Sequence, residues 1–406
     1  MLNLLKKEIN LSFLINPFYI FCASFGLAFI VYFFSWSRIF PPVSPGMIIF
    51  FFLSFILFTV TGKFLHYMVH PEMPQLSQVK LHDHMNDIMF FVIITMGIMN
   101  VVLMGYIPVF NKSADYLKFG IPVLDPLFNS LSIFFSVFYV QSYLERRKKR
   151  YLLYILIIVV FQLLIFRRSA AVWIITSSVF VYFLCRQNIR LLYLFILILI
   201  LPLISFSFGH YGASRSDLSK PYILNDLGAS DRFISSGIDH NHYLTYLYLA
   251  SPVANLQRNV DEGRGFLNDR NFKEFFFYCI VPYSITSRLE KSLGLSSPEP
   301  YLIHPHLIAG TFLMLSYVTI GWAGMITMLI FLLFILLVCL IIIRNLTLFR
   351  NTTLSLLATT VSLLIFSNFL NRLDVILMLF IYPVIFHLIY RRLEKSDHSE
   401  FGKRCA

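Results

Sequence analysis

Ten apolar stretches, each near the length of a membrane span, constrain this chain more than any other feature. A transmembrane helix needs about 20 consecutive, mostly apolar residues. Apolar residues make up 58% of the 406 residues and charged residues 13%, whereas soluble domains have about 45–50% and about 25%. This composition excludes a soluble enzyme and a disordered chain, and it predicts an all-α, polytopic transmembrane helix bundle of about ten spans. The expected spans are residues 12–34, 46–65, 87–108, 121–143, 151–166, 170–185, 191–208, 318–343, 353–370 and 374–390.

Basic residues set the expected orientation. Five of the six residues from Glu145 to Arg150 are basic, and loops rich in Lys and Arg stay on the cytoplasmic side of a membrane. Both termini are then cytoplasmic, and the chain divides into helices 1–7 (1–208), one large outer loop (209–305) and helices 8–10 with a cytoplasmic tail (306–406). Most of the net charge of +12 falls in cytoplasmic loops, so it gives no argument for a nucleic-acid partner.

The large outer loop is expected to be ordered and functional. A connection of about 95 residues is far longer than usual, and such loops are commonly functional or disordered. Two aromatic stretches, residues 242–252 and 272–282, favour order. Both are expected to form helices that lie along the membrane surface with their aromatic side down. The loop is then either a lid packed on the helix bundle or a lid over a lipid-linked substrate.

Four arginines on the expected outer side are candidate anion ligands, because the orientation rule does not explain them. Arg167 and Arg168 stand between two short apolar stretches; they are either snorkelling arginines or a bidentate clamp for phosphate or pyrophosphate, and we favour the clamp. Arg372 either pairs with nearby Asp374 to close a turn or joins the clamp. Arg264 lies between two glycines, where a solvated turn arginine is the simpler interpretation.

Histidines on the outer side are candidate general acids or bases, since His titrates near working pH. His240 follows Asp239, which is placed to orient its ring, and His304 stands directly before an expected span. Each of them also fits an ordinary interface residue. Asp231, Asp239 and Glu299 are carboxylate candidates for the base, and nothing local separates them. The five scattered cysteines and the spacing of the carboxylates do not support a metal site, so we expect no metal and no cofactor.

Three motifs resemble those of the bacterial oligosaccharide repeat-unit (O-antigen) polymerases of the Wzy type. The first is Phe-Arg-Arg-Ser-Ala at residues 166–170, an arginine turn between two spans. The second is the run from Tyr246 to Asn255 in the large loop, and the third runs from Gly310 to Gly324, a Gly-Thr-Phe stretch leading to Gly-x-x-Gly. The large loop also precedes the last three expected spans, which is its position in this family. The acidic residue that the family has before Gly-x-x-Gly is replaced here by Thr319 and Ile320, which leaves the base unassigned.

The resemblance implies a metal-independent membrane glycosyltransferase of the GT-C-like class. Such an enzyme transfers a growing glycan from undecaprenyl pyrophosphate onto a new lipid-linked repeat unit, at the periplasmic face of the bacterial inner membrane. The outer arginines would then bind pyrophosphate, and Tyr246 would contact sugar. The lipid tail would need an apolar groove between helices, and a chain-length regulator protein is a candidate partner. Two alternatives remain open: an O-antigen ligase that transfers glycan to lipid A–core, and a flippase or other transporter of lipid-linked oligosaccharide.

Overall fold

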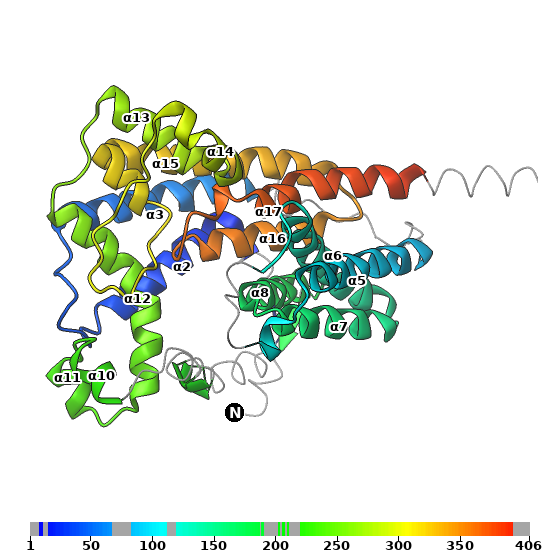
Figure 1. Cartoon of the computed structure of the whole chain (residues 1–406), viewed down its shortest axis with the longest axis horizontal. Helices are drawn as coiled ribbons and strands as arrows, with labels where there is room; N and C mark the ends of the chain where they lie inside the picture. Colours follow the sequence, from blue (N-terminus) through cyan, green and yellow to red (C-terminus); the bar gives the residue numbers. More distant parts are fainter. Residues whose placement is uncertain are drawn as a thin grey trace, which may run out of the picture.

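The computed structural model describes residues 8–10, 15–66, 83–111, 119–186, 188–190, 202–203, 205–207, 209–210 and 220–392. The regular secondary structure of these residues is almost entirely helical (Figure 1). The exception is an antiparallel pair of three-residue strands, β1 (Glu8–Asn10) and β2 (Asn188–Arg190). The prediction of an all-α chain is therefore confirmed.

Within the described residues, five helices are long and apolar enough to cross a membrane. Three shorter apolar helices accompany them. The chain therefore has the character of a multi-pass membrane protein, but the expected ten spans are not confirmed, and the stretch 191–208 lies mostly outside the described residues. The five are α3 (Pro45–Phe64), α5 (Asp83–Met104), α6 (Leu124–Arg146), α15 (Met314–Asn345) and a C-terminal helix (Leu373–Arg392) that starts as α17 (Leu373–Ile376) and η7 (Leu377–Ile381); the shorter ones are α2 (Pro17–Tyr32), α7 (Arg150–Leu164) and α8 (Arg168–Cys185).

The stretch expected to span at 353–370 is instead a short, buried helix, α16 (Arg350–Leu363), in the middle of the bundle (Figure 1). Its residues from Asn351 to Val361 are all buried. The polar ones are satisfied locally or by neighbouring helices: the Thr359 hydroxyl lies 2.8 Å from that of Ser177 on α8, and Thr352 donates to Gln141 of α6 at 2.7 Å. A helix with this many hydroxyls suits the interior because each can find such a partner.

The basic run that set the orientation also joins three helices. Arg146, Lys148 and Arg150 form ion pairs with Asp83 at the start of α5, and Arg150 pairs as well with Asp87 at 3.2 Å. These contacts tie the start of α5 to the end of α6 and the start of α7. Several charges that share partners stabilise more than an isolated surface pair.

The large loop is largely helical in its described part, and its helices pack on the bundle. Its longest helix, α12, contacts α2 and α15, and α13 also contacts α15. Figure 1 shows α12 running crosswise to α3 and α15. The helices are α10 (Lys220–Asn225), α11 (Asp231–Ser235), α12 (His240–Asp261), α13 (Asp269–Phe275) with the π-helical turn η5 (Phe276–Ile280), and α14 (Tyr283–Leu293); the remaining short turns are η3 (Pro108–Phe110) and η6 (Phe369–Asn371).

The expected helix at 242–252 is present as part of α12, but the expected orientation of its aromatic side is wrong. Tyr243 and Tyr246 are buried against Trp36 and Phe233 rather than exposed for contact with a membrane surface. The physical reason is that the neighbouring aromatic rings from the turn after α2 cover this face, which periodicity within one segment cannot reveal. The structure favours a lid packed on the bundle.

A break divides α15 where the Gly-x-x-Gly motif begins. Ile320 and Gly321 are not helical, and Gly321 has φ 66° and ψ −144°, a conformation that is essentially restricted to glycine. Gly265 of the large loop packs against this break, because a Cβ atom there would collide with the backbone of Gly321 and Tyr317. The two glycines therefore allow the loop backbone and the broken helix to touch.

Candidate functional site

Arg167 forms an ion pair with Asp125 at the end of the bundle expected to lie outside. Arg167 is the residue before α8, and Asp125 lies in the first turn of α6. The guanidinium pairs with Asp125 Oδ2, and Nη1 also donates to the Asp125 carbonyl at 3.5 Å. Only 21% and 16% of the two side chains are exposed. Gly120 leaves room for the carboxylate, because a Cβ atom there would overlap it.

A second ion pair lies next to the first. Arg372 donates to both oxygens of Asp374, from Nε at 3.0 Å and from Nη2 at 2.6 Å. The carboxylate also accepts from Asn129, one turn after Asp125 on α6, at 3.1 Å. Asp125 and Asp374 are close enough to repel each other. We call Asp125, Asn129, Arg167, Arg372 and Asp374 the charged cluster.

The charged cluster brings together two of the four predicted arginines. The ion-pair interpretation of Arg372 is confirmed, whereas its role in an anion clamp stays a prediction, as does that of Arg167. With two arginines and two carboxylates the cluster has no net charge. The side chain of Arg168 lies outside the described part of the structure.

Arg264 occupies a different place. Its guanidinium lies 3.9 Å from the centre of the Tyr301 ring and donates to the Glu299 carbonyl at 2.5 Å. Both contacts tie the loop around residues 263–265 to the segment after α14. The contacts seen in the described residues thus place Arg264 as a structural link rather than a member of the charged cluster.

Asp239 caps α12. Its carboxylate accepts the backbone N–H of Asn241 at 2.8 Å, and this bond lowers the pKa of Asp239. His240 Nδ1 lies 3.4 Å from Asp239 Oδ1, so the expected contact between the two side chains is present. A carboxylate with a lowered pKa that is bound to a helix start is a weak base.

His304 lies in a group of three rings with His306 and Tyr222. The two histidine rings are 5.4 Å apart, and Tyr222 meets both edge-on. Burial, with a smaller contribution from His306, lowers the pKa of His304, which keeps the ring neutral at pH 7. Its Nδ1 accepts the backbone N–H of His306 at 3.2 Å, so a base role at Nδ1 requires that this bond open.

Two buried asparagines of α12 hold the segment that carries His304. Asn255 donates to the carbonyls of Leu307 and Ala309 at 2.6 and 2.7 Å and accepts the N–H of Ile303 at 2.9 Å. Asn259, one turn later, bonds both backbone groups of Tyr301, at 2.9 Å each. Asn255 belongs to the motif that carries the family resemblance, but only the structure reveals that it positions residues 303–309.

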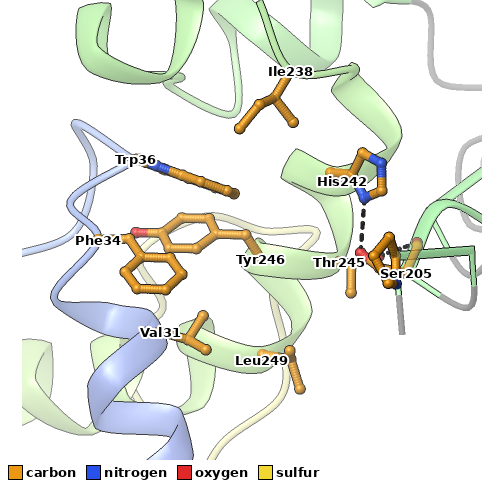
Figure 2. A pocket seen from close by; sticks show the side chains of 10 residues that line it. Val31, Phe34, Trp36, Ser205, Ile238, His242, Thr245, Tyr246 and Leu249 are labelled. Atoms are coloured by element: carbon orange, nitrogen blue, oxygen red, sulfur yellow. Dashed lines mark hydrogen bonds between the residues drawn. The ribbon is translucent and has the colours of Figure 1, made fainter. Parts of the chain in front are cut away.

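Tyr246 lines a pocket of about 470 Å³ at the end of α2 (Figure 2). Its ring stacks with Phe40 and Tyr243 and lies tilted against Trp36. Its buried hydroxyl has no hydrogen-bond partner at ordinary geometry within the described residues. Burial raises the pKa of Tyr246 to about 12. The walls are mostly apolar: Val31, Phe34, Trp36, Pro202, Ile238 and Leu249, with Ser205, His242, Thr245 and Tyr246.

Three polar residues of this pocket, Ser205, His242 and Thr245, bond to one another. His242 Nδ1 lies 3.0 Å from the Ser205 hydroxyl, and the Thr245 hydroxyl donates to the Ser205 carbonyl at 2.6 Å (Figure 2). These bonds leave few polar atoms for a ligand, so the pocket suits a hydrocarbon better than a sugar.

The comparisons with known proteins add no assignment. No family model, no curated protein and no solved structure matches this chain. Within the described residues, no group of three or more His, Cys, Asp or Glu side chains could hold a metal ion.

Asn129 is the member of the charged cluster that sequence reasoning missed. The arginines depart from the orientation rule, and Asp125 is an ionisable residue within an apolar stretch, so both carry a local signal. Asn129 has no such local signal, because an asparagine in an apolar stretch has many structural uses. Its bond to Asp374 joins the start of α6 to the C-terminal helix.

Proposed function

We propose that this chain is a metal-independent membrane glycosyltransferase that polymerises O-antigen repeat units linked to undecaprenyl pyrophosphate. The charged cluster is the observation that carries the proposal. It gathers Arg167 and Arg372, from turns far apart in the chain, at one end of the helix bundle. A pyrophosphate leaving group needs fixed positive charge where its negative charge develops, and guanidinium groups match phosphate geometry.

The ion pairs of the cluster fit this role. A guanidinium among membrane helices needs an anionic partner at all times, because an unpaired charge there is strongly destabilising. Asp125 and Asp374 supply that partner when no substrate is bound. We propose that pyrophosphate competes with these carboxylates for Arg167 and Arg372.

His304 is the favoured group for taking up the proton of the acceptor hydroxyl. Its neutral ring at pH 7 has the protonation state that a general base needs. Asp239, by contrast, is bound to the start of α12 and has a lowered pKa. The His306 ring beside His304 adds a polar group for a sugar hydroxyl.

The pocket beside Tyr246 is proposed to receive part of the hydrocarbon chain of the lipid carrier. Ser205, His242 and Thr245 bond to one another, and most of the other lining residues are apolar. Phe34, at its rim, is 41% exposed and continues the exposed apolar face of α2 that includes Ile30 and Phe33. This continuity would let a chain enter sideways from the bilayer. The expected sugar contact of Tyr246 is the weaker interpretation.

A gel of lipopolysaccharide from a deletion strain tests the function. Loss of a polymerase leaves core capped by a single repeat unit, whereas loss of a ligase or a flippase leaves bare core. Bare core would refute the polymerase proposal and favour one of these alternatives.

Complementation of that strain tests the role of the cluster. We expect that Arg167→Ala and Arg372→Ala each prevent long chains while the protein still inserts in the membrane. Arg232→Ala is the matched control, since Arg232 is exposed on α11, away from the cluster. Normal chain length in both cluster variants would remove the clamp from the proposal.

A further inference from the structure

The helix α14 leaves almost its whole surface uncovered. It runs from Tyr283 to Leu293, and Thr286 is its one buried residue. Ile285, Leu289 and Leu293 are 48%, 38% and 48% exposed. Their spacing of four residues places them in one stripe along the helix. An exposed apolar stripe of this kind marks a surface that contacts something apolar.

The opposite side of α14 is polar. Ser287 and Lys291 are exposed there, and Arg288 is exposed at the edge of the stripe, three residues after Ile285. The only acid of the helix, Glu290, accepts a hydrogen bond from the Tyr278 hydroxyl at 2.6 Å. With two basic residues and one acid, α14 has a net positive charge. An apolar stripe with basic residues beside and opposite it is the pattern of a helix that lies in a membrane surface.

Contacts made by the turn directly before α14 fix the position of α14 along the long axis of the helix bundle. Asn371 donates to the Tyr278 carbonyl at 2.9 Å, and Asn368 donates to the Cys279 carbonyl at 2.7 Å. Both asparagines belong to the turn directly before the C-terminal helix, Leu373–Arg392, which is apolar enough to span a membrane. The start of α14 therefore lies at the level where that helix enters the bilayer.

Contacts with the turn before α14 also fix the rotation of the helix about its axis. The Thr286 hydroxyl donates to the Phe277 carbonyl at 2.6 Å, and Glu290, one turn later, holds Tyr278. These two residues turn one side of the helix toward the protein, so the neighbouring apolar stripe stays outside. The π-helical turn η5, which leads into α14, contacts α15 and η6. In the view of Figure 1, α14 overlaps α15.

We propose that α14 is an interfacial anchor whose apolar stripe inserts into the adjoining leaflet of the membrane that the chain spans. Arg288 and Lys291 remain at the level of the headgroups and favour anionic lipid. The partner is the bilayer because the helix lies at the entry level of a membrane helix. The anchor fixes the height of the large loop relative to the bilayer, whatever reaction the chain performs.

Spin-label accessibility in the full-length protein tests this proposal. The protein is reconstituted in vesicles of phosphatidylcholine and phosphatidylglycerol, and a nitroxide is attached in Leu289→Cys and, as the matched control, in Ser287→Cys. The two positions are about 160° apart around the helix, and both are exposed. The signal of the native cysteines is subtracted with the parent protein, in which Cys279 and Cys339 are buried.

We expect oxygen, which concentrates in lipid, to relax the label at position 289 more than a water-soluble nickel complex does, and the reverse at position 287. With a second label in Leu293→Cys, the added change Leu289→Glu should shift that label toward the nickel complex, whereas Ser287→Glu should not. Equal access of the nickel complex at 289 and 287 would overturn the proposal. So would shielding of 289 from both reagents, because a second copy of the protein would then cover the stripe.

Discussion

Removing Arg167 alone and removing it together with Asp125 should affect stability in different ways. The two groups form one ion pair between the start of α6 and the start of α8. In Arg167→Ala the carboxylate stays behind with its partner gone. In the double variant Arg167→Ala with Asp125→Ala, neither charge is left unpaired.

The expected magnitude follows from the burial of the pair. Breaking a buried pair by removing one partner destabilises a protein by about 3–5 kcal/mol. Because 21% of Arg167 and 16% of Asp125 stay exposed, we expect about 3 kcal/mol, the lower end of that range. Replacing both charges by apolar groups of similar volume is often neutral. The two alanines also remove packing contacts, so the double variant should recover most, but not all, of the lost stability.

Thermal unfolding in detergent measures the effect on stability, and chain elongation in the complemented deletion strain measures the effect on function. The double variant should recover most of the thermal midpoint lost in Arg167→Ala but should still fail to elongate chains. A double variant as unstable as the single one would refute the argument about the unpaired carboxylate. A double variant that elongates normally would show that Arg167 has only a structural role.

Three further predictions concern the large loop. Gly265→Ala should lower the thermal midpoint strongly because its Cβ would meet the break in α15, whereas Gly263→Ala, which has open space and the same sign of φ, should cost only about 1–2 kcal/mol. If His304 is the base, elongation by the purified protein should fall as the pH drops below about 6.5. His306→Ala should move this fall to higher pH, because His306 lowers the pKa of His304. An unchanged pH profile in that variant would count against the role of His304 as the base. Asn255→Asp should destabilise the protein by about 3 kcal/mol or more, because two backbone carbonyls lose a donor and face a carboxylate instead; an unchanged thermal midpoint would contradict this reasoning.

The lowered pKa of His304 also has a consequence for stability, with a defined sign. As the pH falls below the ordinary pKa of a histidine, His304 takes up a proton in the unfolded chain before it does so in the folded protein. Stability should therefore decrease as the pH falls through this window and level off below the folded pKa. In His304→Gln this dependence should disappear from the thermal midpoint; its persistence would assign it to another group.

The sequence by itself determined the class of protein and the kind of residue to suspect. Hydropathy over about 20 residues is a local property, so it correctly predicted helices apolar enough for a membrane, including α3, α5 and α15. Charge against the orientation rule is also local, and it drew attention to Arg167 and Arg372. The pairing of Arg372 with Asp374 was one of the interpretations and is confirmed, whereas the pairing of Arg167 with Asp125 was not expected.

Only the tertiary structure revealed which groups from distant segments contact these arginines and their carboxylate partners. The bond between Asn129 and Asp374 joins α6 to the C-terminal helix, and no pattern within either segment encodes it. The same holds for α16, which has the composition of a weak span but is enclosed by other helices, and for the aromatic side of α12, which Trp36 covers. A side chain is buried only when other segments of the chain pack against it. One stretch of sequence therefore indicates which of its residues can be buried, but it does not indicate which segments will cover them.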